Sequence, residues 1–222
     1  MNRIYFKDNP WPNSHSIKEF EWEARLEPDS GIWFDLHLKS EDYDADDIVE
    51  EEEEEEEDDR PDWYHKIVWN NYHAVTLSST FWGHKGLLVG TEANHLDFTK
   101  LAHTTFEVDT LPLQDERDYE DGAFGIYLLG HDAAADHRIH FEKNTGSIDF
   151  TVRWSGKIAL MYAGQEEFKY DFDATITNVT FSGIKLPEGY SPEKRRLLLA
   201  SFVSDVDLFV WSHERERFVL RS

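Results

Sequence analysis

Residues 19–39 read EFEWEARLEPDSGIWFDLHLK, and this stretch gives the clearest indication of the fold. Apolar and polar residues alternate over 19–27 and again over 32–39, which is the period of a strand with one face in a core. The four residues Pro-Asp-Ser-Gly between them are typical of a turn. The stretch therefore predicts an antiparallel β-hairpin.

The second half of the chain predicts further strands. Residues 138–142 and 147–154 flank a Lys-Asn-Thr-Gly turn and predict another hairpin. Residues 157–162 are expected to pair back after a turn at 155–156. The alternation that follows shifts its phase at Asn178, which predicts a β-bulge.

Outside these hairpins the pattern predicts further strands and one helix. Residues 63–69 and 72–81 are rich in apolar and aromatic residues and are expected to be strands. A single α-helix is expected late in the chain, at about 192–202, because Ser191 suits an N-cap and Pro192 suits the first helical position.

Together these elements predict an all-β protein. Many short strands with one late helix indicate an antiparallel β-sandwich or a curled, barrel-like sheet. No internal repeat or Gly/Ser/Pro linker divides the sequence. Residues 1–222 are therefore predicted to form a single β domain, with an acidic loop insertion at about 41–61.

Composition narrows the class of function. The chain lacks cysteine, which excludes thiol chemistry and disulfides. Its net charge of -24 opposes binding to phosphate backbones and anionic lipids, so we expect no nucleic-acid or membrane partner. Residues 1–12 contain no secretory apolar run, and no later stretch is long enough to cross a bilayer, so the sequence predicts a cytoplasmic protein.

Most of the net charge lies in one segment. Residues 41–59 hold 15 of the 46 acidic residues, and the other 31 exceed the 22 Lys and Arg by nine. Ten consecutive carboxylates cannot be buried, so they must be solvated or bound to a cation or basic partner. The predicted partner-binding residues are Glu50, Glu51, Glu52, Glu53, Glu54, Glu55, Glu56, Glu57, Asp58 and Asp59.

The start of the acidic segment has a partial calcium-binding pattern. Asp42, Asp44 and Asp46, with Glu53 at the twelfth position, fit most of the EF-hand template. Asp47 stands where that template needs glycine, and helices are not expected on either side. Loose counterion binding is the preferred interpretation.

A second cluster has the donor types of a divalent-metal site. The candidate ligands are His131, Asp132, Asp136, His137 and His140. In a strand over 138–142, His137 and His140 would face opposite sides, and residues 133–135 are expected to form a small surface loop. We therefore predict a polar loop without a cofactor, and keep a divalent metal as the alternative.

Acidic side chains on the outer strand faces are the remaining catalytic candidates. They are Glu167, Asp171 and Asp173, together with Asp149 beside Arg153. Paired carboxylates can act as acid and base in glycoside hydrolysis. Cross-strand charge pairing explains the same pattern, and the chain has no nucleophile elbow or phosphate-binding glycine loop, so no catalytic residue is predicted.

Several aromatic residues are candidates for a binding surface. They are Trp33, Trp63, Trp69 and Trp82, with His84 nearby. Such rings can stack on a sugar or anchor a protein partner. Burial in the core or beneath a covered second face is the preferred interpretation.

These observations favour a non-enzymatic, acidic protein-binding module that neutralises or sequesters a basic partner protein. By composition alone, the chain is similar to immunity and inhibitor proteins that neutralise basic toxins. The alternative is a β-sandwich metal-dependent enzyme or a carbohydrate-binding domain. A third hypothesis is that the acidic loop folds over the basic stretch 194–196 and the C-terminal Arg215, Arg217 and Arg221, within the protein or its oligomer. The sequence does not indicate the oligomeric state.

Overall fold

The computed structural model describes residues 2–45, 60–113 and 121–221, and β-strands dominate it. The strands are β1 Arg3–Phe6, β2 His15–Glu27, β3 Gly31–Ser40, β4 Thr76–Ser78, β5 Leu87–Gly90, β6 Thr105–Val108, β7 Gly125–Tyr127, β8 His131–Lys143, β9 Phe150–Ala159, β10 Tyr170–Val179, β11 Ile184–Lys185, β12 Phe209–Ser212 and β13 Arg217–Leu220. The α-helices are α1 Lys66–Tyr72 and α2 Pro192–Ala200, and the 3-10 helices are η1 Asp62–Tyr64, η2 Leu101–His103, η4 Met161–Ala163 and η5 Val206–Leu208.

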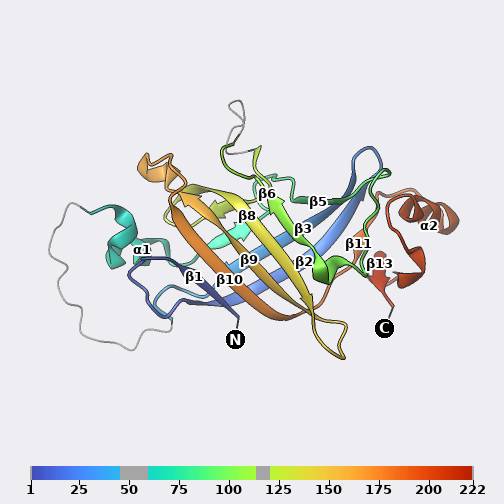
Figure 1. The fold of residues 1–222 in the computed structure, drawn as a ribbon, viewed down its shortest axis with the longest axis horizontal. Coiled ribbons are helices and arrows are strands. Elements are labelled where there is room, and N and C mark those ends of the chain that lie inside the picture. The colour runs from blue at the N-terminus through green and yellow to red at the C-terminus, as the bar shows by residue number, and fades with distance from the viewer. Residues whose placement is uncertain (1, 46–59, 114–120, 222) are drawn as a thin grey trace.

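Eight of these strands close into an antiparallel barrel. Their order is β2-β1-β10-β9-β8-β7-β4-β3, and β3 pairs back onto β2 (Figure 1). Closure pairs strand edges that an open sheet would expose. The prediction of an all-β protein with a curled, barrel-like sheet is confirmed. No helix in the described ranges is long and apolar enough to span a membrane.

The hairpin predicted over 19–39 is confirmed as β2 and β3. Its register runs from Glu19 opposite Lys39 to Glu27 opposite Gly31. Gly31 has a φ of +139°, and a Cβ there would lie 2.1 Å from the carbonyl oxygen of Gly90. A side chain at this position would therefore force the β2–β3 turn away from β5.

The second half also forms its predicted strands, with two corrections. The bulge at Asn178 is confirmed by a register shift between β9 and β10 and by a φ of +57°. The turn predicted at 155–156 and the strand at 157–162 expected to pair back after it are wrong, because β9 continues to Ala159 and Met161–Ala163 form η4. The missing side chain of Gly156 leaves room for Phe172 and His137. The surface loop predicted at 133–135 is also wrong, because these three alanines are buried in β8.

The strands predicted at 63–69 and 72–81 are largely wrong. The first region forms η1 and α1, and the second contains only the short strand β4. Trp63 and Trp69 are fully buried, and their indole N–H groups donate to the carbonyls of Lys7 and Trp63. These tertiary contacts fix a helical turn at one end of the barrel (Figure 1).

The late helix is confirmed as α2, at the other end of the molecule (Figure 1). Ser191 caps it by accepting a hydrogen bond from the N–H of Lys194. Between the two ends, large rings pack through the barrel. The ring of Trp22, for example, contacts five phenylalanines: Phe34, Phe98, Phe141, Phe150 and Phe181. The interior is therefore a packed aromatic core, and candidate binding sites are best sought on the outer surface.

Candidate functional site

A row of aromatic rings lies on the outside of the barrel, around β7. We call it the aromatic strip, and its members are Tyr72, Phe81, Trp82, Tyr127, His131 and Tyr162. Phe81, Trp82 and Tyr162 are 47%, 48% and 69% exposed. Scattered exposed rings are common on proteins, but a connected set marks an interaction surface.

The rings contact one another in sequence along the strip. The centroid distances are 5.7 Å for Phe81–Trp82, 6.0 Å for Trp82–His131, 5.3 Å for His131–Tyr127, 6.0 Å for Tyr127–Tyr72 and 6.4 Å for Tyr72–Tyr162. All five pairs meet edge to face, the arrangement that aromatic quadrupoles favour. Each ring thus limits the motion of the next.

Two glycines leave space for these rings to pack directly on the backbone of the barrel wall. A Cβ on Gly125 would lie 2.2 Å from Nε2 of His84 and 2.9 Å from the ring of Trp82. A Cβ on Gly130 would lie 2.6 Å from the ring of Tyr162. The backbone of β7 and of the turn before β8 is therefore the surface on which the strip packs.

A buried polar network fastens the β4–β5 loop, which carries Phe81 and Trp82, to β3. Asp35 is only 6% exposed; it forms a salt bridge with Arg25 and accepts a hydrogen bond of 2.9 Å from Oγ of Ser79. Arg25 also donates to the carbonyl of Lys85 at the far end of the loop. Because the network holds both ends of the loop, it fixes the position of its rings.

His37 supports the same loop from below. Its Nδ1 lies 3.0 Å from Oγ of Ser78, and its ring centroid lies 4.6 Å from that of Phe81. Burial lowers the pKa of His37, against the opposing effect of Glu21 and Glu19. A neutral imidazole therefore packs beneath Phe81 at neutral pH.

Gly86 ends this loop, and we expect Gly86→Ala to destabilise the protein by about 3 kcal/mol. Its φ is +74°, and a Cβ would lie 2.4 Å from the carbonyl oxygen of Phe34. Gly83 is the matched control, because its φ is +80° but no atom lies within 4 Å of its Cβ position. Gly83→Ala should cost only about 1 kcal/mol. Urea unfolding measures both, and equal losses would contradict a steric role for Gly86.

The predicted aromatic candidates divide between core and surface. Trp82 lies in the strip and His84 beneath it, whereas Trp63 and Trp69 belong to the core. Trp33 is half-buried on the outer face of β3, where Arg25 lies 5.6 Å from its ring. The preference for burial thus holds for two of the four tryptophans.

The predicted metal ligands are not gathered into one site. His131 belongs to the strip, whereas His137 lies inside the barrel with its Nδ1 accepting from the indole of Trp154. Nδ1 of His140 lies 3.1 Å from the carbonyl of Thr104, and Asp136 sits at the β8 bulge. The described part of the chain contains no group of three His, Asp or Glu side chains able to hold a metal ion.

Two of the strand-face carboxylates, Asp171 and Asp149, have cross-strand or local partners. Lys157 lies 2.6 Å from Asp171, and Arg153 lies 2.8 Å from Glu142. Asp149 accepts from the hydroxyls of Thr180 and Ser147, which lower its pKa. Burial, followed by repulsion from Asp171, raises the pKa of Asp173. This arrangement is the charge pairing expected on the outer face of a sheet.

The predicted acidic partner-binding residues 50–59, and Asp46 and Glu53 of the calcium-like pattern, lie outside the described residues. The structure does describe the chain on both sides of them. The N–H of Tyr43 donates to the carbonyl of His73, directly after Tyr72 of the strip. Arg60 leads into η1 and α1, and α1 ends at Tyr72. Both flanks of the acidic segment are thus joined to one end of the strip.

No protein-family model matches this sequence, and comparisons with curated proteins and with solved structures found no match either. The candidate site is therefore defined by its geometry. It consists of a row of six contacting rings, four of them exposed and two half-buried, and a polar network that supports the row. Such a surface can bind a partner by stacking and charge, and no catalytic set is evident among the described residues around it.

Proposed function

We propose that this chain is a non-enzymatic binding protein that recognises a basic partner protein through the aromatic strip. The observation that carries the proposal is the continuous row of six contacting rings, four of them exposed, which packs on the barrel wall and is held by a buried network. Aromatic side chains dominate protein interfaces because they bury large areas with few rotatable bonds. A pre-positioned row also lowers the entropy lost on binding.

The charge distribution supports a basic partner. The net charge is -24, and the described residues on both sides of the acidic segment reach one end of the strip, where the N–H of Tyr43 donates to the carbonyl of His73, next to Tyr72. A charged segment beside a docking surface accelerates encounter with an oppositely charged protein, while the packed contacts determine how long the complex lasts. We therefore assign steering to residues 50–59 and specificity to the strip. Covering a basic functional surface in this way would neutralise or sequester the partner.

Affinity capture with matched baits tests the proposal. We expect basic proteins to be retained by the wild type and lost by the double variant Trp82→Ala/Tyr162→Ala. Tyr5→Ala is the control, because Tyr5 is 40% exposed on β1 and lies outside the strip. Removing two hot-spot rings should weaken binding of the recovered partner by about 30-fold or more, measured by surface plasmon resonance.

Salt dependence separates the two assigned roles. The association rate should fall steeply with ionic strength, whereas the dissociation rate should change little. Neutralising residues 50–59 to Gln and Asn should reduce the association rate and its salt dependence. Binding that is unaffected by the strip variant, or an association rate that is equal at low and high salt, would overturn the proposal. Retention of a glycan in place of a basic protein would favour the carbohydrate-binding alternative.

A further inference from the structure

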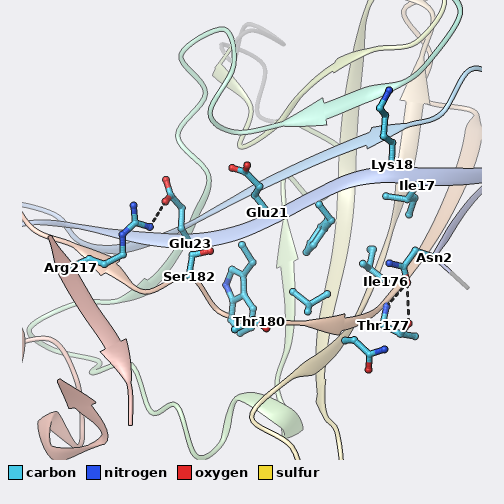
Figure 2. A pocket seen from close by; sticks show the side chains of 14 residues that line it. Asn2, Ile17, Lys18, Glu21, Glu23, Ile176, Thr177, Thr180, Ser182 and Arg217 are labelled. Carbon is cyan, nitrogen blue, oxygen red and sulfur yellow. Dashed lines mark hydrogen bonds and ion pairs between the residues drawn. The ribbon is translucent and has the colours of Figure 1, made fainter. Parts of the chain in front are cut away.

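The barrel wall has an opening between β2 and β10, on strands that do not form the strip. The strand between them, β1, has only four residues, whereas β2 has thirteen and β10 has ten. At the end of the opening away from Asn2, the segment that follows β10 reaches β2, and the N–H of Ser182 donates to the carbonyl of Trp22. A cavity of about 500 Å³ lies in this wedge (Figure 2).

Polar side chains surround the opening. Figure 2 shows Lys18, Glu21 and Glu23 along β2, Asn2 and Thr177 at one end, and Ser182 and Arg217 at the other. The amide oxygen of Asn2 accepts from the N–H and the hydroxyl of Thr177, as a paired strand would at that position. The side chain of Asn2 thus occupies the acceptor position that a neighbouring strand would supply to Thr177.

The edge of β2 presents free main-chain groups to the opening. Ala24 donates to Gly183 and Trp22 accepts from Ser182, so the even-numbered residues of β2 direct their N–H and C=O groups to this side. The alternation places the N–H and C=O of Phe20 and the N–H of Trp22 there too. In the described structure these three groups have no hydrogen-bond partner, and such an edge is a template for another strand.

The indole of Trp22, in the wall of the cavity, is a further unpaired donor. The side chain of Trp22 lines the cavity and is fully buried, yet its Nε1–H has no hydrogen-bond partner among the described residues. Buried polar atoms without a partner are rare in folded proteins.

The rim of the opening carries both charge signs, and one of its carboxylates is available to a cation. Lys18 pairs with Glu41, and Arg217 and Lys185 both pair with Glu23. Glu21 is exposed between them, and no salt bridge to it is found in the described ranges. A Lys or Arg on an inserted strand would therefore meet an available carboxylate.

We propose that the opening binds a short extended segment of a basic protein as an added strand, with main-chain bonds to Phe20 and Trp22 and a Lys or Arg beside Glu21. The distance along β2 from Ile17 to Trp22 accommodates about five residues at 3.3 Å each. This mode of recognition is strand addition, in which main-chain bonds give affinity and alternate side chains give specificity. It shares with the proposed function only the basic character of the partner, since it uses a different surface.

A synthetic peptide tests the proposal on the full-length protein. The probe is acetyl-Thr-Lys-Val-Lys-Val-Lys-Thr-amide, whose lysines and valines would face outward and inward. Amide hydrogen exchange followed by NMR should show Phe20 and Trp22 exchanging rapidly in the free protein, while Glu21 and Glu23, paired with β3, are protected. Saturating peptide should slow exchange at Phe20 and Trp22 by at least tenfold.

Two matched controls remove non-specific attraction to the acidic segment. The same peptide, N-methylated at its five central residues, keeps its charge but loses its main-chain donors, so its affinity should fall more than tenfold. Glu21→Gln should weaken the unmodified peptide about 2- to 5-fold. The Trp82→Ala/Tyr162→Ala variant should bind the peptide normally, which separates failure here from failure at the strip. Rapid exchange that persists with saturating peptide, or equal affinity for the N-methylated peptide, would overturn the proposal.

Discussion

Lowering the pH from 7 to 4.5 is expected to reduce the unfolding free energy of the wild-type protein by about 2 kcal/mol through His137 alone. This side chain is fully buried inside the barrel. Its Nδ1 accepts a hydrogen bond of 3.2 Å from the indole of Trp154, so Nε2 carries the proton, and Nε2 has no hydrogen-bond partner among the described residues. A second proton would place an uncompensated charge in an aromatic core.

The direction of the effect follows from the pKa. Burial lowers the pKa of His137 to about 4, despite the opposing influence of Asp109, the Ala134 carbonyl and Asp136. Above pH 6.5 the imidazole is neutral in both the folded and the unfolded protein, and its full contribution to stability is present. As the pH falls through 6.5, the unfolded chain takes up a proton that the folded chain does not, so stability is lost until about pH 4.

Urea unfolding of the wild type and His137→Gln over this pH range measures the effect. The glutamine does not titrate, and its amide oxygen can still accept from Trp154, so the pH-dependent loss should shrink by about 2 kcal/mol. The control is His140→Gln, because His140 is only half-buried and lies on the opposite face of β8. The remaining slope is expected from His37, whose pKa burial also lowers. Identical slopes for wild type and His137→Gln would contradict this account.

The fold was predictable where alternation is local and one strand face is buried. The β2–β3 hairpin meets both conditions, since Trp22, Phe34 and Leu36 point inward and charged residues occupy much of the opposite face. The bulge at Asn178 was also predictable, because a phase shift within one strand leaves a mark in the sequence itself. These features depend on neighbours in the chain and on a single core.

Other elements depend on contacts that the sequence does not display. Trp63 and Trp69 are six residues apart, which does not distinguish a strand from a short helix. Their burial against Phe6 and Tyr170 at the barrel end selects the helix. Gly156 reads as a turn residue, but its role is to leave space for Phe172. In both cases tertiary packing overrides the local pattern.

The candidate site was predictable only in part, for the same reason. Trp82 could be identified as a candidate binding residue because it lies in a predicted loop beside Gly83. Tyr72, Tyr127 and Tyr162 come from α1, β7 and η4, and nothing in the sequence relates them. Only closure of the barrel brings these elements together. A surface built from separated segments therefore has no local sequence signature.

The strip depends on the network beneath it, and Asp35 is the centre of that network. The residue receives bonds from β2, through Arg25, and from the β4–β5 loop, through Ser79. Asp35 is almost completely buried, whereas the Arg25 side chain is 28% exposed. Water thus screens the arginine in part, and most of the cost of breaking the pair should fall on groups that lose their acceptor.

Asp35→Ala should therefore lower the unfolding free energy by about 3 kcal/mol and release the loop that carries Phe81 and Trp82. The substitution leaves the partly buried Arg25 with Glu27 as its remaining carboxylate partner, and leaves the Ser79 hydroxyl with only the carbonyl of Leu36, 3.5 Å away, as an acceptor. Urea unfolding measures the loss, and the double variant Arg25→Met/Asp35→Leu should recover most of it, because no uncompensated charge remains. Partner affinity should fall in the single variant, since Phe81 and Trp82 lose their fixed position while remaining in the chain. Unchanged stability in Asp35→Ala would show that the loop is held by its other contacts, and unchanged affinity would show that the strip does not need this support.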